Sequence, residues 1–285
     1  MAGESRPLGR VPAEGLFVAG ALAQYVGASL AVLLFAVVPA SGVAWLRVLA
    51  AAGALAAWRR PWETRWSGRA LGLAAGFGIV LAAMNLTFYL AIDRLPLGTA
   101  VAIEFCGPIA VATLGSRTRR DAAALGLAVL GVLLLADVHL AGAPLGVGLA
   151  LAAGGFWALY IVLGHRLAME PGLRPRDGLA AGMGIGALAF APFLVASAGP
   201  AFAAPWRLGA CLLVGLLSSV VPYGLDQLAM TRLPRARFAL LLSILPATAA
   251  IVGAVVLGQL PGPAELAGIG LVVAASAMRS HTPQP

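Results

Sequence analysis

Long apolar stretches, separated by short segments rich in Pro, Gly and Arg, account for most of this chain. A helix needs about 20 apolar residues to cross the hydrocarbon core of a bilayer. The pattern predicts an all-α integral membrane protein with ten transmembrane helices, of which the second and fifth are short. The predicted helices are 15–36, 42–58, 70–91, 95–115, 122–138, 145–164, 178–197, 208–230, 234–256 and 263–279.

The chain also repeats part of its own sequence. Arg94-Leu95-Pro96 recurs as Arg232-Leu233-Pro234, and eight of the 26 positions in 90–115 match their partners at the same offset of 138. Each half contains five predicted helices, and an odd number means that the second half enters the membrane from the opposite side. We therefore expect two inverted five-helix repeats, residues 1–139 and 140–285, an organisation typical of secondary transporters.

Composition supports a lipid environment. The chain is 61% hydrophobic and only 11% charged, whereas a soluble domain averages roughly 25% charged residues. The net charge of +8 comes from 19 Arg without a single Lys. These arginines lie in short clusters between apolar stretches, which is typical of cytoplasmic loops and not of a nucleic-acid-binding face.

The arginines also predict the orientation. With the N-terminus in the cytoplasm, 16 arginines lie inside, only Arg94 and Arg207 lie outside, and Arg47 lies within a predicted helix. This distribution satisfies the positive-inside rule and places both termini in the cytoplasm. The first apolar run, 15–38, exceeds the roughly 7–15 residues of a signal-peptide core, so we expect it to be an uncleaved helix.

Charged side chains inside the apolar stretches are the first functional candidates, because each costs about 2.5–3.5 kcal/mol on insertion scales. Glu104 lies in the middle of 95–115, far along the chain from other charged residues. Its carboxyl is expected to favour the neutral form and to bind either a proton or a cationic amine. The alternative is a structural role, in which a protonated Glu104 is hydrogen-bonded to a neighbouring helix.

Arg47 and Asp226 are the other two charged candidates. Arg47 is predicted about one turn inside its helix from the outer face, where it is suited to bind a substrate carboxylate. Alternatively, it extends to the interface or pairs with a carboxylate structurally. Asp226 lies near the inner end of 208–230 and shares a helix face with Tyr223. Its alternative role is an interfacial ion pair with the arginines of 232–237.

Neutral side chains add candidates for a binding surface. Asn85 and Tyr89 are four residues apart on one helix face, Gln24 lies in the middle of the first helix, and Trp157 and Tyr160 share a face of the sixth helix. For these residues, interhelical hydrogen bonding or simple packing is the alternative interpretation.

Two prolines occupy repeat-related positions inside predicted helices. Pro108 and Pro246 each free a backbone carbonyl one turn earlier and disturb the helix there. Broken helices at matching positions of two halves indicate a central binding site in transporters. Glu104 precedes Pro108 by one turn, so its carboxyl and the loosened backbone are expected to lie together.

No catalytic, metal or cofactor site is predicted. Cys106 and Cys211 lie in apolar stretches and are interpreted as small buried hydrophobes. His139, His165 and His281 lie at loops or the tail without metal-ligand spacing, and a chain without Lys cannot complete a Walker loop. We expect no enzyme activity and no cofactor. The expected partners are a small-molecule substrate, protons and the bilayer, with the protein a monomer or homodimer.

Three segments resemble a known family. These are YLAIDRLPLGTAVAIEFCGP at 89–108, GSRTRR at 115–120, and SSVVPYGLDQLAMTRLPRARFALLLSILPA at 218–247. They resemble the EamA family of the drug/metabolite transporter superfamily, and within it the threonine/homoserine exporter branch. The resemblance covers essentially the whole chain.

The resemblance implies an inner-membrane carrier that exports amino acids or related metabolites, in exchange for protons. It matches Glu104 to a glutamate in the branch's fourth helix, Arg47 to a basic position in the second helix, and Asp226 to a position often held by Glu. Two positions depart from the family pattern, because Leu245 and Gln259 stand where relatives commonly have Glu. If the missing glutamate helps to couple protons in other family members, coupling in this chain must rest on Glu104 and Asp226.

Two other functions are weighed against this interpretation. A broad exporter of drugs or hydrophobic amines would use Trp157, Tyr160, Tyr89 and Tyr223 as an aromatic lining, although Arg47 argues against a purely cationic substrate. A membrane-embedded enzyme acting on lipid would need a His or Asp cluster near the interface, and the sequence offers none.

Overall fold

A computed structural model describes residues 11–114, 118–171, 173 and 175–280, and Arg6, Arg10, Arg117, Arg174 and His281 lie outside these ranges. Within them the chain is helical and contains no strand, which confirms the all-α class. The α-helices are α1 (Ala13–Leu34), α2 (Ala40–Arg59), α3 (Gly68–Ile92), α4 (Leu97–Glu104), α5 (Cys106–Leu114), α6 (Arg119–Leu140), α7 (Pro144–Ala168), α8 (Pro175–Phe202), α9 (Pro205–Gly215), α10 (Val221–Met230), α11 (Arg235–Leu242), α12 (Leu245–Leu257) and α13 (Pro263–Ser280).

Eight helical segments of the described chain are long and apolar enough to cross a membrane, and each overlaps one of the predicted stretches. The two remaining predictions, 95–115 and 263–279, correspond to the shorter apolar segments Leu97–Thr113 and Pro263–Met278. The prediction that the second and fifth helices are short is wrong in detail. α2 begins directly after Pro39, and α6 gains a polar first turn from a capping box between Thr118 and Asp121.

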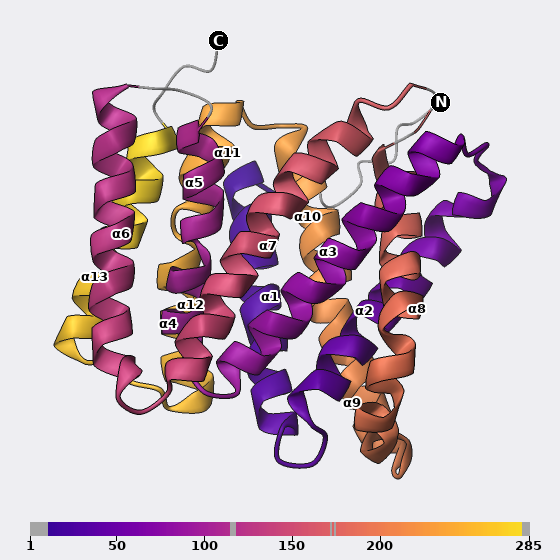
Figure 1. The fold of residues 1–285 in the computed structure, drawn as a ribbon, viewed down its shortest axis with the longest axis horizontal. Coiled ribbons are helices and arrows are strands. Elements are labelled where there is room, and N and C mark those ends of the chain that lie inside the picture. The colour runs from indigo at the N-terminus through magenta and orange to yellow at the C-terminus, as the bar shows by residue number, and fades with distance from the viewer. Residues whose placement is uncertain (1–10, 115–117, 172, 174, 281–285) are drawn as a thin grey trace.

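Helices that are far apart in the sequence form the bundle (Figure 1). α2 packs against α8, α6 against α13, α3 against α7, and α1 against α10. The larger buried cluster joins the first four helices to α12 and α13, and a second cluster fills the space between α2, α3 and α8. The first and second halves of the chain are therefore interleaved.

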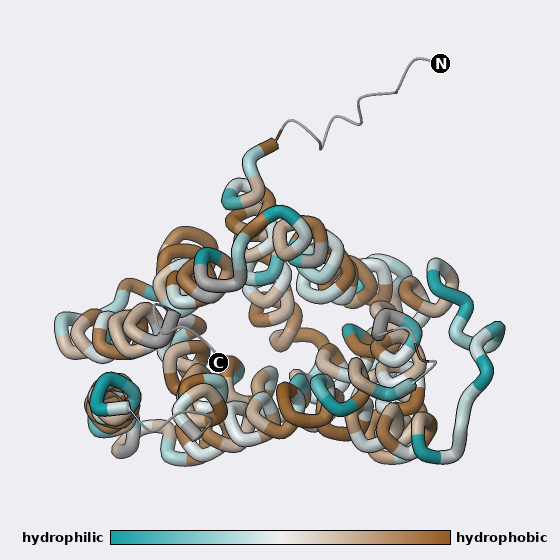
Figure 2. The backbone as a smooth tube through the Cα atoms, turned by 90° about the horizontal axis from the view of Figure 1, so that it is seen from above, coloured by the Kyte–Doolittle hydropathy of each residue, from teal (hydrophilic) through white to brown (hydrophobic). Residues whose placement is uncertain are grey.

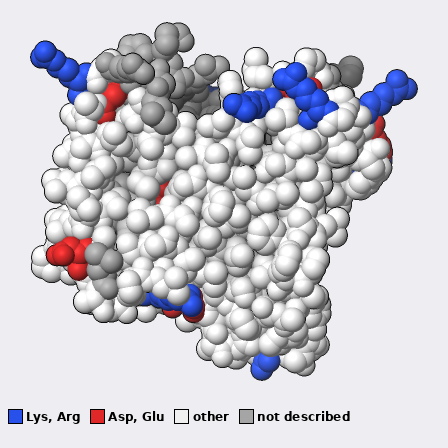
Figure 3. Space-filling model, viewed as in Figure 1, with Lys and Arg blue, Asp and Glu red and all other residues white. Residues whose placement is uncertain are grey.

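The lateral surface of the bundle is apolar, as lipid contact requires. Large hydrophobic side chains such as Phe193, Val255 and Leu260 are more than three-quarters exposed. Figure 2 shows apolar residues on the outer faces of the helices as well as between them. In Figure 3 most charged residues of the visible face lie toward its upper and lower parts, and the broad region between them is white apart from a small acidic spot.

Ion pairs join separate segments at the end of the bundle that carries most of the described arginines. Arg69 pairs with Glu170 at 3.3 Å, and Arg237 pairs with Glu14 at 3.6 Å. At the opposite end, Arg94 pairs with its neighbour Asp93 at 3.1 Å. At least one side chain of each pair lies at the surface, so each pair is worth little stability. The pairs nevertheless show which helix ends lie together.

Two helices are interrupted at repeat-related positions. α4 ends at Glu104 and α5 begins at Cys106, whereas α11 ends at Leu242 and α12 begins at Leu245. Each interruption lies about one turn before a proline, Pro108 or Pro246. A proline ring clashes with the carbonyl four residues earlier and cannot donate the hydrogen bond that would continue the helix. Here that carbonyl belongs to the last residue of α4 or of α11.

Close backbone contact between α3 and α8 yields a first prediction. A Cβ atom added at Gly78 would overlap the backbone carbonyl of Gly182, whereas nothing lies within 4 Å of a Cβ added at Gly72 on the same helix. Gly78→Ala should lower stability by about 1–3 kcal/mol, as overpacking does. Thermal unfolding in detergent measures this effect, and Gly72→Ala is the matched control. Equal melting temperatures for the two variants would show that the helices separate without cost.

Candidate functional site

Arg47 is held in the interior by three contacts. It lies about two turns into α2, deeper than the single turn expected, and is only 8% exposed. Its Nε donates to Ser219 Oγ at 3.1 Å, and its Nη2 donates to the Ser218 carbonyl oxygen at 2.8 Å. Its guanidinium carbon lies 5.1 Å from the centroid of the Tyr89 ring, at cation-π range. Two of its five N–H groups are thus used by these hydrogen bonds.

The partners of Arg47 come from an irregular turn. The helix predicted over 208–230 consists of α9, a π-helical turn at Leu216–Val220, and α10. A π turn widens the helix and disturbs its regular backbone pairing, and such turns are frequent at functional sites. The Ser218 hydroxyl donates to the carbonyl of Gln24 on α1 at 3.3 Å. The turn therefore connects α1 and α2 at the level of Arg47.

Glu104 is buried where α4 ends. It is 7% exposed, and none of the hydrogen bonds or ion pairs found among the described side chains involves its carboxyl. It interacts electrostatically with Arg47, yet the two do not approach to the 4.0 Å of an ion pair. Next to it, the Phe105 ring packs edge-on against Trp157 of α7, with 5.0 Å between centroids.

Three further candidates lie in the electrostatic surroundings of this pair. Asp226 and Tyr223 of α10 interact with each other, Tyr223 also interacts with Arg47, and Tyr160 of α7 interacts with Tyr223. Tyr25 of α1, which sequence reasoning missed, lies within range of both Glu104 and Asp226. Its position four residues before Ser29 and one after Gln24 carries no distinguishing pattern in the sequence.

Among the described residues, no side-chain hydrogen bond joins Asn85 or Gln24 to this group. The Asn85 side chain donates to the carbonyl of Leu81 in its own helix at 2.8 Å. The polar contact found at Gln24 involves its backbone carbonyl. The alternative role of Asp226 was an ion pair with the arginines of 232–237. Asp226 is half-buried and forms no ion pair among the described side chains, and Arg237 of that cluster pairs with Glu14 instead.

The described part of the chain contains no cluster of three or more His, Cys, Asp or Glu that could hold a metal ion. Cys211 is buried and Cys106 is half-buried, and both are free thiols.

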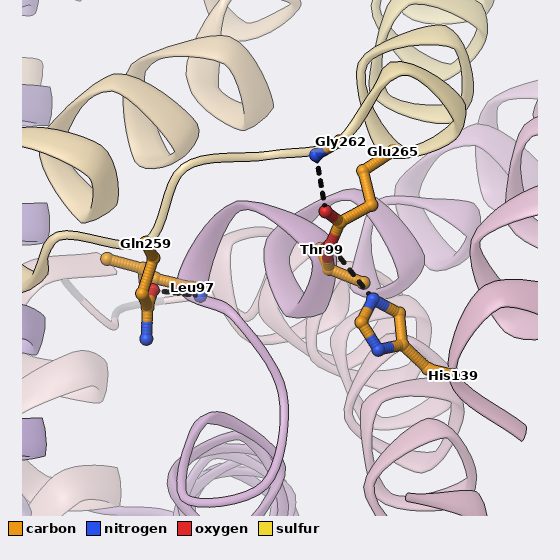
Figure 4. Close-up of polar contacts among 6 residues, drawn as sticks. All are labelled: Leu97, Thr99, His139, Gln259, Gly262 and Glu265. Carbon is orange, nitrogen blue, oxygen red and sulfur yellow. Dashed lines mark hydrogen bonds and ion pairs between the residues drawn. The ribbon is translucent and has the colours of Figure 1, made fainter. Parts of the chain in front are cut away.

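A second polar cluster joins α4, α6 and α13 (Figure 4). Glu265 Oε1 accepts a hydrogen bond from Thr99 Oγ1 at 3.1 Å and lies 2.9 Å from His139 Nε2. Glu265 Oε2 accepts from the backbone N–H of Gly262 at 2.7 Å. His139 was expected at a loop but lies in the last turn of α6. Sequence reasoning missed the cluster because Glu265 lies 166 residues from Thr99 and 126 residues from His139.

This cluster is expected to stabilise the fold. Glu265→Ala leaves the N–H of Gly262 and the side chains of Thr99 and His139 without their acceptor, which should cost about 1–3 kcal/mol for each group that stays buried. Glu265→Gln retains an acceptor oxygen and should cost less. Melting temperatures of the two variants in detergent test the order, and an Ala variant as stable as the Gln variant would contradict it.

The chain is similar in sequence to known proteins over most of its length. The model of the EamA-like transporter family matches residues 144–280. The chain is 40% identical over 260 residues to the threonine/homoserine exporter RhtA of Escherichia coli (strain K12), which covers 88% of this chain and 85% of that protein. The exporter of the same name from Salmonella typhimurium (strain LT2) is 39% identical over the same shares.

The chain belongs to the EamA-like transporter family. This membership, with the apolar helices, makes it a multi-pass membrane protein and a transporter, not an enzyme. A solved crystal structure that is 19% identical has a TM-score of 0.56 and covers 92% of this chain and 95% of the other, so the fold is shared. Membership in a transporter family excludes the interpretation as a lipid-modifying enzyme.

One of the two departures from the family pattern has a structural role here. Gln259 Oε1 accepts a hydrogen bond from the backbone N–H of Leu97 at 2.9 Å, in the first turn of α4 (Figure 4). The first N–H groups of a helix have no partner within it, so this family member supplies one from the other half of the chain. Leu245 is buried in the first turn of α12.

Proposed function

We propose that the protein is an inner-membrane secondary transporter that exports small amino acids or related metabolites, with threonine and homoserine as the first candidates. The observation that carries this proposal is the buried pair of Arg47 and Glu104, a guanidinium and a carboxyl that interact electrostatically without forming an ion pair. An amino-acid zwitterion complements such a pair, because its carboxylate suits a guanidinium and its ammonium suits a carboxylate. Relatives named as threonine/homoserine exporters support the substrate class.

The transport unit consists of ten transmembrane helices in two inverted repeats, residues 1–139 and 140–285. The helix interruptions before Pro108 and Pro246 support the repeat, because they fall at equivalent positions of the two halves. The packing also supports it. α2 and α8 are the second spans of the two repeats, and α6 and α13 are the fifth. α2 contacts α8 and α6 contacts α13, as expected for repeats related by a two-fold axis in the membrane plane. In this arrangement two spans are shorter than the others. One is formed by α4 and α5 together, and the other is α13.

Both termini lie in the cytoplasm. The excess of arginine on one side of the predicted topology supports this orientation, with Arg94 and Arg207 at the opposite side. The ion pairs Arg69–Glu170 and Arg237–Glu14 support the placement of those loops at a common end.

Transport is driven by exchange for protons. The ionised Glu104 carboxylate binds the substrate ammonium during export. When the empty site turns back toward the other side of the membrane, the same carboxylate binds a proton, so substrate and proton compete for one carboxyl. The surroundings of Glu104 support this role, since a buried carboxyl without a hydrogen-bonding partner changes its charge more readily than one that is fixed in an ion pair. Asp226 is the second candidate for coupling.

Purified protein in liposomes tests the proposed function. With an imposed proton gradient, wild type should accumulate radiolabelled threonine and homoserine, and protein-free liposomes should not. Dissipating the gradient with a protonophore should abolish accumulation. Folded protein that moves neither amino acid would refute the assignment of substrate and direct the search to a wider panel of metabolites.

A broad exporter of hydrophobic amines is the second candidate, favoured by aromatic side chains next to Glu104 and to Tyr223. Trp157 stacks edge-on with Phe105, and Tyr160 packs against Phe77 with 5.0 Å between centroids. Efflux of a cationic dye from the same liposomes separates the two functions. Threonine that competes with the dye would favour one broad site, whereas dye efflux without threonine uptake would favour the amine exporter.

A further inference from the structure

The hydroxyl group of Tyr89 is buried and has no hydrogen-bond partner among the described residues. Tyr89 lies near the end of α3 and is fully inaccessible to solvent. Its ring is fixed by edge contacts with Phe35 and Phe88, at centroid separations of 6.0 and 6.1 Å. A buried polar atom without a partner is costly and calls for an explanation. One explanation is a ligand that supplies the missing hydrogen bond.

The position of this hydroxyl relates it to the proposed substrate site. The Arg47 guanidinium lies over the Tyr89 ring, 5.1 Å from its centroid. The hydroxyl oxygen is a substituent of that same ring, so it lies within the length of a small amino acid from the guanidinium. A substrate whose carboxylate binds Arg47 can therefore place its side chain beside the Tyr89 hydroxyl.

We propose that the Tyr89 hydroxyl is a specificity-determining group that hydrogen-bonds the side-chain hydroxyl of the substrate. This inference rests on the proposed function, because threonine and homoserine have in common an aliphatic hydroxyl group on a short side chain. A tyrosine hydroxyl both donates and accepts, so it matches an alcohol in either direction. A site that is built around such a hydrogen bond rejects analogues that lack the hydroxyl, because its own polar group then stays unpaired.

Tyr89→Phe tests this role by removing one oxygen. The ring remains, and with it the contacts to Arg47, Phe35 and Phe88, so the fold and the position of the guanidinium are retained. Thr87→Val is the matched control on the same helix, since the Thr87 hydroxyl already donates to the carbonyls of Ala83 and Met84 at 2.8 and 3.1 Å. Both variants lose a hydroxyl group, but only the Tyr89 group is unpartnered.

The experiment measures competition against radiolabelled threonine in proteoliposomes. Unlabelled threonine is compared with valine, which has the same shape without the hydroxyl, and homoserine is compared with norvaline. Wild type and Thr87→Val should prefer the hydroxylated member of each pair. In Tyr89→Phe this preference should fall about ten-fold, the effect of one hydrogen bond between neutral groups, with valine inhibition unchanged.

The outcomes separate this inference from the proposed function. If wild type transports threonine and Tyr89→Phe keeps the full preference over valine, the hydroxyl has no role in recognition and only this inference is wrong. If wild type transports neither amino acid, the proposed function itself falls. Thermal stabilisation of detergent-purified protein by threonine and by valine gives a second readout, and equal stabilisation of wild type by the two would also overturn the inference.

Discussion

Proteoliposomes that contain Glu104→Gln are expected to lose proton-driven accumulation of threonine. The amide has the shape of the neutral carboxyl, but it neither releases a proton nor attracts the substrate ammonium. Any residual uptake should therefore be independent of pH, whereas uptake by wild type should vary with pH. Stability should be retained, because replacing a buried ionisable group by a neutral isostere removes the cost of its charge without opening a cavity.

The control for this prediction is Glu63→Gln, which removes a carboxyl from the short 3₁₀ helix at Pro61–Glu63. The Glu63 side chain is 61% exposed and pairs only with Arg60 at 3.3 Å among the described side chains. Its variant should transport like wild type. Asp226→Asn completes the series. Normal pH dependence in Glu104→Gln, together with its loss in Asp226→Asn, would transfer the coupling role to α10.

Arg47→Met is expected to remove the preference for substrates that carry a carboxylate. Hydrogen bonds to charged groups contribute about 1.5–3 kcal/mol, so the apparent affinity for threonine should fall about 10- to 100-fold. Threoninol, the amino alcohol that lacks the carboxylate, provides the discriminating readout. Wild type should strongly prefer threonine to threoninol, and the variant should bind the two almost equally.

Arg47→Lys and Arg94→Met define the limits of this effect. Lysine keeps the charge but not the planar fork of N–H groups, so Arg47→Lys should be intermediate. Arg94 lies at a helix end beside Asp93 and should be dispensable for affinity. If Arg47→Met lowers thermal stability yet keeps the full preference for threonine, Arg47 serves only to hold the π-helical turn at Ser218 and Ser219.

The sequence predicted the helices well because their signals are local. Apolar stretches of sufficient length identify the eight long helices, and the two prolines lie one turn after the interruptions of α4 and α11. The predicted length of the second helix was less accurate, because its ends depend on Pro39 and on a left-handed Arg60 (φ 49°) rather than on hydropathy. Glu104 and Arg47 were identifiable because charge within an apolar stretch is costly wherever the helix packs.

The contacts of these residues could not be predicted in the same way. The Arg47 guanidinium meets a carbonyl 171 residues away, in a π turn that no local pattern announces. The unpartnered Tyr89 hydroxyl and the links between Thr99, His139 and Glu265 depend on the rotation of each helix about its axis and on its depth beside its neighbours. Hydropathy is averaged over whole turns and does not specify either quantity. The sequence by itself therefore determined which segments are helical and which charges are buried in lipid-embedded helices. Only the tertiary structure decided which groups face one another, because hydrogen bonds require positions accurate to fractions of an ångström.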